Sequence, residues 1–495
     1  GHCLCVTSMC HAVSHAIHRS WARPHMSAGR PITIRHMTAV ESVTHTLEQS
    51  ALLDDAYAND RARVFHSWSA QGALNPTVIA GALGSKFWDD TGTTWIDFTS
   101  MLVNMNLGHQ HPKMIQAIKD QLDTLCMVAP PFANDQRSEA ARLIVEKANL
   151  GRDGAARAGG HFEKVFFTNA GAEGVENAVR MAKGYTGRMK VLSAYRSYHG
   201  GTALTVGLTG EPRRLENEPS VPGLVKFWGP YPFRSAFHSS SPEQETQRAL
   251  QHLRDTILME GADKVAAIVL ESVIGTNGIL VPPPGYLEGL RAICDEFGIV
   301  WIADEVMAGF GRTGQWFAWQ NWDAQPDLIV FAKGVNSGYI PLGGVVISGP
   351  IAHHFDTKMF PGGLTYSGHP LACSSAVASI GIFEEEGVLA HARHLGNDII
   401  GPALRDIAER HPSVGEVRGL GVFWAVELVT DPATRETAPP STVAAVVAEC
   451  KAHGMWPLSA ANRVHVVPPC TTPDDVVRDG LAILDAALAV ADAAM

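Results

Sequence analysis

The chain has 495 residues, of which 46% are hydrophobic and 18% charged, and its formal net charge is −11 at pH 7. These values are typical of a soluble globular protein with two or more structural units. The negative charge argues against a general binder of nucleic acid or of an anionic membrane. No apolar run reaches the roughly 20 residues that a membrane-spanning helix needs.

The first 36 residues differ from the rest, because they are rich in histidine, cysteine and arginine and contain no acidic residue. Such a tract could be a transit peptide, or a metal site using Cys3, Cys5, Cys10, His11 and His15. The His-Met pair at 36–37 favours a third interpretation, a tag, cloning junction or mis-called start, with Met37 beginning the ordinary chain. We therefore expect residues 1–36 to be disordered and exclude them from the fold prediction.

The remaining sequence alternates between helical and strand-like patterns. A helix is expected from about residue 45, and further helices at 172–183, 244–260, 285–297, 371–385 and 387–410 and from 473 onwards. Short apolar runs predict strands at 86–88, 94–98, 166–168, 191–194, 265–270, 299–303, 328–331, 344–347, 422–428 and 464–467. Strands alternating with helices indicate a largely parallel sheet that is covered on both faces.

This pattern predicts an α/β protein with a large domain at 95–350. Residues 37–94 and 351–495 are expected to build a smaller α+β domain from both ends of the chain. Beyond the first ten residues the cysteines are scattered singly, with no paired metal-ligand spacing, which is typical of a reducing cytoplasm. No resident metal is predicted.

An acidic pair and a glycine-rich loop follow the predicted strand at 299–303. Residues 302–314 read IADEVMAGFGRTG, so that Asp304 stands at the end of the strand. Ligands of parallel α/β sheets bind beyond the carboxyl ends of the strands. The Asp304 carboxylate is therefore expected to point into a site, and a solvated loop acid is the alternative.

A lysine, Lys333, ends the next predicted strand, in the segment LIVFAKG at 328–334. Burial in an apolar setting lowers the pKa of a lysine and makes its amine nucleophilic. The alternative is a surface lysine, but the pairing of Lys333 with Asp304 at a neighbouring strand end favours a reactive site.

With a third segment, LTYSGHPLAC at 364–373, these motifs resemble the signature series of class III aminotransferases that depend on pyridoxal 5′-phosphate (PLP). The resemblance spans roughly residues 60–490. It implies fold type I, with a large, mostly parallel sheet domain and a smaller α+β domain. It also implies that the cofactor is held by Lys333 as a Schiff base, and that Lys333 then serves as general acid and base.

The same resemblance assigns the other cofactor contacts. Asp304 would keep the pyridine nitrogen protonated, which makes the ring an electron sink, and Val306 would pack against one ring face. Gly171 and Ala172, between a strand and a helix, resemble the phosphate-binding turn. The remaining expected contacts are Tyr198 and His199 of the Tyr-His-Gly motif on the other ring face, Glu271 beside the ring, and Thr365, which would reach the phosphate of a neighbouring subunit in a homodimer.

The substrate is less clearly indicated. Ornithine-type relatives carry an arginine three residues before a Pro-Pro pair, and His465 stands there in this chain. We therefore expect Arg463 to clamp a carboxylate or sulfonate, a surface arginine being the alternative, while Arg418 is expected to be structural. Trp68 is expected in the substrate pocket or in the core. The pattern favours ω-amino donors such as taurine, β-alanine or 4-aminobutyrate, with pyruvate or 2-oxoglutarate as acceptor.

Other functions stay open. An aminomutase or a decarboxylating transaminase would share the same cofactor residues. A non-catalytic scaffold of this fold would be expected to have lost Lys333 or Asp304, and a nicotinamide-dependent dehydrogenase would need a Gly-x-Gly-x-x-Gly turn after its first strand. Lys333 and Asp304 are both present, and no such glycine turn follows the first strand, so neither of these two alternatives fits the sequence.

Overall fold

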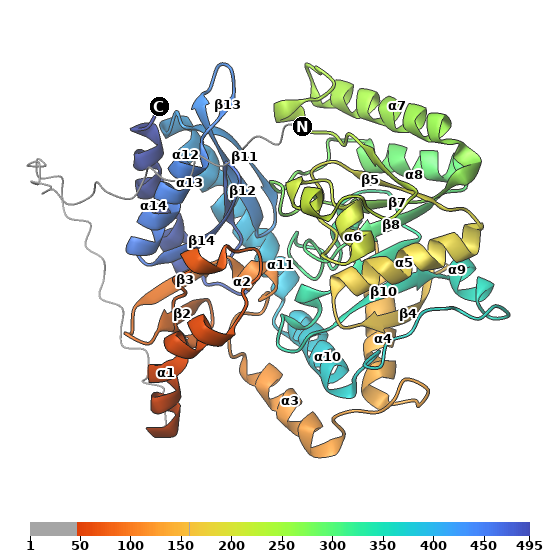
Figure 1. The fold of residues 1–495 in the computed structure, drawn as a ribbon, viewed down its shortest axis with the longest axis horizontal. Helices are drawn as coiled ribbons and strands as arrows, with labels where there is room; N and C mark the ends of the chain where they lie inside the picture. Colours follow the sequence, from red (N-terminus) through yellow and green to blue (C-terminus); the bar gives the residue numbers. More distant parts are fainter. Residues whose placement is uncertain (1–46, 158) are drawn as a thin grey trace, which may run out of the picture.

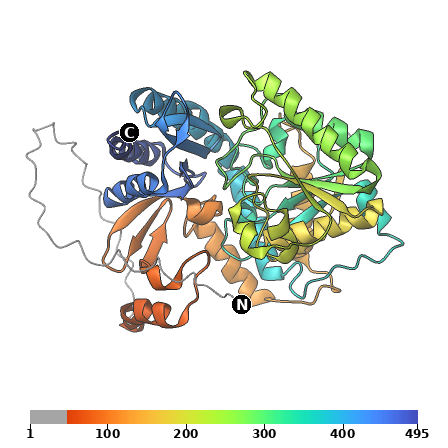
Figure 2. The same ribbon diagram turned by 45° about the horizontal axis from the view of Figure 1, so that its top comes forward.

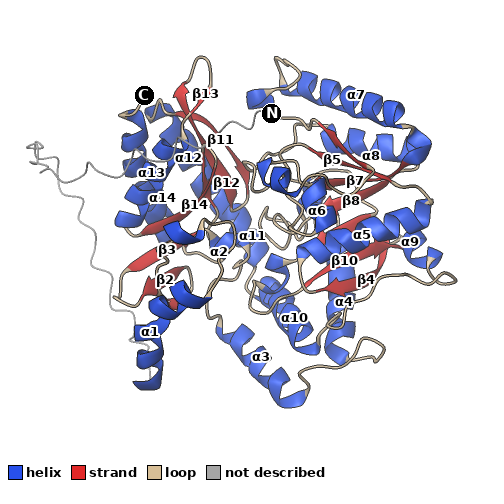
Figure 3. Cartoon of the chain, in the orientation of Figure 1, coloured by secondary structure: helices blue, strands red, loops and turns tan. Residues whose placement is uncertain are grey.

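The computed structural model describes residues 47–157 and 159–495, which form two sheets, each with its own helices (Figure 1). The expected leader at 1–36 and the expected start at Met37 lie outside the described residues. Figure 3 shows the strands gathered into these two separate groups.

The larger group is a seven-stranded sheet in the order β4-β10-β9-β8-β7-β5-β6. Its central pairs are parallel, and β10 alone runs antiparallel to both of its neighbours. The predicted mostly parallel sheet is confirmed. Its strands are β4 (Phe162–Thr168), β5 (Lys190–Ala194), β6 (Leu224–Phe227), β7 (Val265–Glu271), β8 (Val300–Asp304), β9 (Leu328–Phe331) and β10 (Gly343–Ser348).

Both faces of this sheet are buried, which explains why its strands are apolar runs without strict alternation. On β8, Ile302 packs with the residues of helix α5 (Gly171–Thr186). Trp301 and Ala303 pack on the opposite face with those of α7 (Pro242–Glu260) and α8 (Tyr286–Phe297). Helix α5 is followed by Gly187, whose φ of 71° lies in the left-handed region that glycine adopts most easily.

The helices of the large unit are α3 (Pro112–Thr124), α4 (Asp135–Ala148), α5 (Gly171–Thr186), α6 (Ala203–Leu208), α7 (Pro242–Glu260), α8 (Tyr286–Phe297), α9 (Gly349–His354) and α10 (Pro370–Glu385). The remaining helices are α1 (Leu47–Arg63), α2 (Ser100–Val103), α11 (Val388–His394), α12 (Gly401–Arg410), α13 (Pro440–Ala452) and α14 (Asp474–Asp492). The helix expected at 387–410 is thus divided, with a π-helical segment at Leu395–Ile400 between α11 and α12.

The second sheet combines strands from both ends of the chain, in the order β1-β2-β3-β14-β15-β12-β11, with β13 paired to β12. The junction is the parallel pair β3–β14, in which Ile96 lies opposite Met455. Figure 2 shows the orange strands of the N-terminal segment beside the blue elements of the C-terminal segment. The exact domain boundaries stay a prediction. The strands are β1 (Ile79–Leu83), β2 (Lys86–Asp89), β3 (Thr94–Phe98), β11 (Val414–Leu420), β12 (Phe423–Asp431), β13 (Glu436–Thr437), β14 (Met455–Ala460) and β15 (Arg463–Val466).

A search of the described helices for membrane spans found none with the necessary length and apolar composition.

Candidate active site

Three neighbouring strands of the large sheet end in chemically active side chains. Glu271, the last residue of β7, pairs in register with Asp304, the last residue of β8, and Asp304 pairs with Val330 of β9. Lys333 follows β9 after one intervening residue, Ala332. Parallel strands with a shared register place their carboxyl ends together, so the sheet assembles an acid, a second acid and an amine at one edge.

The Asp304 carboxylate is buried and held from two sides. Its Oδ1 accepts a hydrogen bond from the backbone N–H of Val306 at 3.1 Å, and its Oδ2 lies 2.7 Å from Nδ1 of His199. The other ring nitrogen of His199, Nε2, is buried and has no hydrogen-bond partner among the described residues. His199 therefore orients Asp304 and leaves the remaining lone pairs of the carboxylate available.

Glu271 is buried beside this pair. Its Oε1 accepts from the backbone N–H of Tyr198 at 3.0 Å, and its Oε2 accepts from that of Gly275 at 2.8 Å. Burial raises the pKa of Glu271 to about 7, and nearby Asp304 adds to the shift while His199 opposes it. Glu271 can therefore exchange a proton near neutral pH.

Lys333 begins a short 3₁₀ segment, Lys333–Asn336, with φ of 47°, a backbone conformation that is strained for a lysine. No hydrogen bond or ion pair joins its Nζ to another described residue. Burial lowers its pKa; Asp304 and Glu271 oppose this shift, while Arg213 and Arg312 add to it. Lys333 is therefore a nucleophilic amine without a competing partner.

The first turn of α5 lies against these groups. A Cβ on Gly171 would come within 2.6 Å of Val306, and one on Gly200 would come within 2.6 Å of Ala172. The glycines thus bring the helix N-terminus, Val306 and the Tyr-His-Gly turn together. The N–H groups of the first helical turn have no partner within the helix and can bind an anion.

These residues fit PLP. The free amine of Lys333 suits its aldehyde, the α5 N-terminus at Gly171 and Ala172 suits its phosphate, and Asp304 suits its pyridine nitrogen. The buried, unpaired Nε2 of His199 is one further polar group that a bound molecule could satisfy.

Comparison with known proteins agrees with this geometry. The sequence profile of the family described as aminotransferase class III matches residues 68–488. The chain belongs to the class III aminotransferase family.

Two relatives show how far the similarity extends. A probable 4-aminobutyrate aminotransferase from Bacillus subtilis is 34% identical over 84% of this chain and 93% of its own length. A taurine–pyruvate aminotransferase from Rhodobacter capsulatus is 32% identical over 82% of this chain and 89% of its own length.

Among solved structures, a taurine:2-oxoglutarate aminotransferase from Bifidobacterium kashiwanohense in complex with PLP and glutamate is 39% identical, with a TM-score of 0.85. The structural match covers 89% of this chain and 98% of the chain in that structure. The predicted fold type I, the PLP cofactor and the aminotransferase activity are therefore confirmed.

PLP supplies this class III aminotransferase with an electron sink for the substrate carbon that loses its proton. The chain's own residues provide the rest of the chemistry. Asp304, oriented by His199, would supply the negative charge that keeps the pyridine nitrogen protonated. The Lys333 Nζ can take up and return a proton because burial lowers the pKa of this amine.

Of the predicted substrate residues, Arg463 and His465 lie on one strand, β15, whereas Trp68 lies in the N-terminal segment. Trp68 is 68% exposed and lies near Tyr198, where Arg213 stacks on both rings. His465 of β15 is buried, and neither ring nitrogen has a partner among the described residues. Burial, with Arg463 and Arg418 nearby, lowers the pKa of His465 to about 3, so its ring is neutral and does not act as an anion clamp.

Arg463 lies at the boundary between the two units. Its Nη1 donates to the backbone carbonyl of Asn277, and its Nε lies 3.8 Å from Glu427. Arg418 on β11 donates to Glu427 at 2.7 Å and to the carbonyl of Gly278 at 2.7 Å, as expected of a residue with a structural role.

Sequence reasoning missed one cation at the active site, Arg213. Its guanidinium carbon lies 4.1 Å from the ring centroid of Tyr198 and 5.5 Å from that of Trp68. Its Nε pairs with Glu211, but its terminal nitrogens make no hydrogen bond to a described residue. Arg213 lies in a 3₁₀ segment, Pro212–Asn217, whose sequence has no periodicity or strand-end position that could have identified it.

Thr365 lies in the exposed loop that leads into α10, and its side chain makes no hydrogen bond to another described residue. The neighbouring Ser367 Oγ donates to the carbonyl of Phe167 near the end of β4, which fixes the loop beside the large sheet. The expected role of Thr365 at a partner's phosphate stays a prediction.

Proposed function

We propose that this aminotransferase takes the amino group of an ω-amino acid or ω-aminosulfonate, the class of taurine, β-alanine and 4-aminobutyrate, and transfers it to a 2-oxo acid such as pyruvate or 2-oxoglutarate. The position of Arg213 carries this proposal. Donors of this class have an amine at one end and an anion at the other. An amine directed at Lys333 therefore needs a cation at the opposite end of the pocket.

Arg213 meets this requirement. It is close enough to Lys333 to help lower the pKa of the lysine, and its guanidinium carbon lies over the rings of Tyr198 and Trp68, which stabilises its position. The two terminal nitrogens can then donate to a carboxylate or sulfonate as a fork. The names of the relatives, which act on 4-aminobutyrate and taurine, support the same class of donor.

The protein's part in the reaction follows from these positions. Arg213 binds the anionic end of the donor, so that the amine-bearing carbon faces Lys333. The Lys333 Nζ removes the proton from that carbon and later returns a proton when the 2-oxo acid is aminated. Tyr198 and Val306 lie against the two faces of the cofactor ring and hold the ring in its plane.

The proposal includes a homodimer in which Thr365 reaches the phosphate bound by the partner subunit. Thr365 is exposed, and the adjacent Tyr366 is a large aromatic residue with 57% of its surface exposed. Tyrosine and other aromatic residues are enriched at protein interfaces relative to the rest of the surface. A reducing compartment such as the cytoplasm is supported by the described cysteines, none of which forms a disulfide.

The test follows the visible absorbance of PLP-loaded protein while taurine, β-alanine, 4-aminobutyrate and ornithine are added singly. We expect an ω-amino donor to convert the bound cofactor to its pyridoxamine form, and a 2-oxo acid to reverse the change. Arg213→Gln should raise the KM for that donor about tenfold or more, since it removes a charged hydrogen bond. Arg214→Gln, one residue further along the chain, is the matched control and should leave this KM unchanged.

Two results would overturn the proposal. Equal effects of the two arginine variants would remove the role given to Arg213. A protein that binds PLP but aminates no 2-oxo acid from any donor would favour an aminomutase or a decarboxylating reaction.

A further inference from the structure

A half-buried lysine, Lys226, lies on β6, an edge strand of the large sheet, opposite Ser193 of β5. Its Nζ donates a hydrogen bond to the Oγ of Ser193 at 2.8 Å. It also donates to the backbone carbonyls of Gly207 at 2.6 Å and Leu208 at 2.7 Å. The Ser193 Oγ donates to the same Leu208 carbonyl at 2.7 Å, so that the strands β5 and β6 both bind the end of α6.

The carbonyls that Lys226 contacts belong to the last turn of α6. The last carbonyl groups of a helix have no partner within the helix and need donors from elsewhere. The carbonyl of Thr205 accepts from the backbone N–H of Thr209, whereas those of Gly207 and Leu208 accept from Lys226. A lysine in this position stabilises the end of a helix. Because Lys226 lies on β6, it also fixes the end of α6 to the sheet.

The protonation state of Lys226 does not decide this contact. Burial lowers the pKa of Lys226 to about 7, Arg214 adds to the shift and Glu218 opposes it. An ammonium group has three N–H donors, one for each acceptor, and a neutral amine keeps two. The two carbonyls of α6 therefore have a donor in either state.

The two residues after α6, Thr209 and Gly210, are bonded to the Tyr-His-Gly turn of the cofactor pocket. The Thr209 Oγ1 accepts from the backbone N–H of His199 at 3.0 Å. The Gly210 N–H donates to the Ser197 carbonyl at 2.9 Å and to the Ser197 Oγ at 3.1 Å. The Gly210 carbonyl accepts from the N–H of Arg196 at 3.0 Å. The position of the turn therefore depends on where α6 ends.

The fit between these two segments is tight. A Cβ on Gly210 would lie only 2.1 Å from the carbonyl oxygen of Ala194, so the two backbones approach as closely as glycine allows. The start of the turn is held separately, because the Arg196 guanidinium lies 4.9 Å and 5.0 Å from the ring centroids of Trp228 and Tyr231. A shift at the end of α6 would therefore act mainly on the far part of the turn, where His199 lies.

Two parts of the pocket depend on this placement. His199 Nδ1 lies 2.7 Å from the Asp304 carboxylate and orients it. Arg213 comes three residues after Gly210, which limits the distance between their Cα atoms to about 11 Å. The end of α6 thus supports both the group that orients Asp304 and the cation proposed for the donor.

We propose that Lys226 is a positioning residue for transamination, because it fixes the end of α6 and thereby holds His199 against Asp304 and Arg213 in the pocket. Its role is indirect, since the hydrogen bonds of its Nζ go to β5 and α6. The part that concerns Arg213 rests on the proposed function and deepens it. The part that concerns His199 holds for any amino donor.

The first test measures amide hydrogen exchange in the cofactor-free protein. Lys226→Met keeps an unbranched side chain but removes the N–H donors. Exchange at the amides of His199, Thr209 and Gly210 should become roughly tenfold faster or more, because the hydrogen bonds that hold the end of α6 are lost. Lys190→Met is the matched control. Lys190 is also a half-buried lysine, on β5, and its Nζ bonds to the carbonyl and the carboxylate of Glu260, so its loss should leave these three amides unchanged.

The second test measures the donor half-reaction of the PLP-loaded protein. Lys226→Met should lower its maximal rate about tenfold, because His199 no longer fixes Asp304, and raise the KM for the donor about tenfold, because Arg213 is displaced. Lys190→Met should change neither value. If Lys226→Met does not fold, Ser193→Ala is measured instead. It removes the hydroxyl that joins Lys226 to Leu208 and should accelerate exchange at the same amides about threefold.

The outcomes separate this inference from the proposed function. Faster exchange in Lys226→Met supports the role of Lys226 even if no ω-amino donor reacts. Equal exchange at these amides in the variant and the unmodified protein would overturn it. Equal effects of Lys226→Met and Lys190→Met would also overturn it, because the loss of any half-buried lysine would then be enough. A lower rate with an unchanged donor KM would support the role toward His199 and overturn the role toward Arg213.

Discussion

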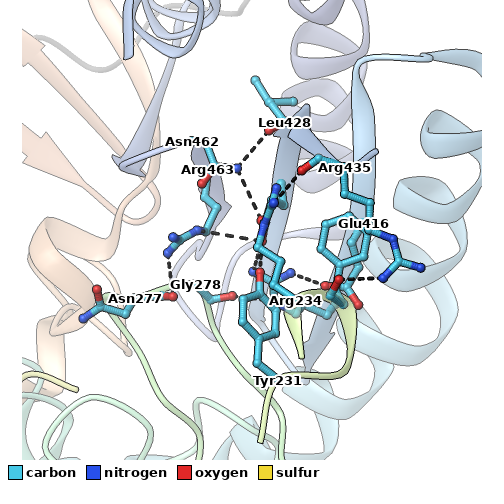
Figure 4. A network of polar contacts seen from close by, with 12 residues as sticks. Tyr231, Arg234, Asn277, Gly278, Glu416, Leu428, Arg435, Asn462 and Arg463 are labelled. Atoms are coloured by element: carbon cyan, nitrogen blue, oxygen red, sulfur yellow. Dashed lines mark hydrogen bonds and ion pairs between the residues drawn. The ribbon is translucent and has the colours of Figure 1, made fainter. Parts of the chain in front are cut away.

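The cofactor pocket and the arginine cluster, which is the group of Arg234, Arg418 and Arg463 around Glu427 where the two units meet (Figure 4), treat their carboxylates in opposite ways. In the pocket, burial raises the pKa of Glu271 to about 7. In the cluster, burial alone would raise the pKa of Glu427, but Arg418, Tyr231 and Arg234 outweigh it and lower the pKa to about 2. Glu271 and Glu427 are both buried, so the cations around each carboxylate decide whether its pKa rises or falls.

The difference in pKa matches a difference in role: the pocket is suited to chemistry, and the cluster is suited to holding the two units together. The pocket keeps Lys333 free of partners and Glu271 near its titration point, which suits proton transfer at neutral pH. The cluster keeps Glu427 ionised and joins β12 to β11 and to the turn at Pro232–Arg234, which suits a joint between the two units. Changes in the pocket should therefore alter chemistry, and changes at Glu427 should alter stability.

The largest expected effect comes from Lys333→Ala. Turnover should fall by roughly 10³-fold or more, because the variant lacks the amine that we propose holds the cofactor and moves the proton. Stability should not fall, since the substitution removes a buried amine that has no partner. Steady-state rates check the first part, and thermal unfolding of the cofactor-free proteins checks the second. Lys264→Ala, on the surface, is the control. A markedly lower unfolding temperature for Lys333→Ala would show that the pocket, like the cluster, contributes to stability.

The next effect is on stability. Glu427→Gln removes the charge that neutralises Arg234 and Arg418 and should lower the free energy of unfolding by about 3 kcal/mol. Urea denaturation measures this change, with exposed Glu436→Gln in β13 as the control. The donor half-reaction should be unaffected, because Arg213 and Lys333 remain in place. A loss of donor reactivity at unchanged stability would show that Glu427 belongs to the chemistry instead.

The two regions also differ in how far the sequence reveals them. The central strands of the large sheet, β5 and β7 to β10, were predicted because each is an apolar run, and α5, α7, α8 and α10 because each has a regular pattern. Strand β6 and the helices α3, α4, α6 and α9 were not predicted. Strand β11 was missed because its sequence, VGEVRGL, contains two glycines and two charges, and those charges are buried in the ion pairs of the cluster. Strand β14 was missed because Pro457 interrupts its apolar run.

The same contrast holds for the site residues. Asp304 and Lys333 could be identified because strand ends in a parallel sheet meet at one edge, whatever the distance in sequence. Arg213 and Arg196 could not, because stacking on rings from other segments gives them their positions. Their side-chain surroundings depend on tertiary contacts of Trp68, Trp228 and Tyr231 that no local pattern encodes.

The smallest effect concerns the pH dependence that the pocket imposes on stability. The pKa of Glu271 is about 7 in the folded chain against an ordinary 4.5, so the folded state holds this proton more tightly than the unfolded state does. The free energy of unfolding should therefore fall as the pH rises from about 4.5 to 7 and level off above 7. Glu271→Gln should remove this decrease in the free energy of unfolding.

Relative to the unmodified protein, Glu271→Gln should gain stability across that window, by at most roughly 3 kcal/mol. The lost hydrogen bond to Tyr198 or Gly275 offsets the gain by an amount that does not depend on pH. Glu305, whose pKa burial also raises to about 7, is present in both proteins, so its contribution cancels. Thermal unfolding of the cofactor-free proteins between pH 5 and 7.5, with exposed Glu409→Gln as the control, isolates the difference. If the stability of the two proteins changed with pH in parallel, Glu271 would already be ionised in the folded protein. The carboxylates of Glu271 and Glu427 would then share the same charge state.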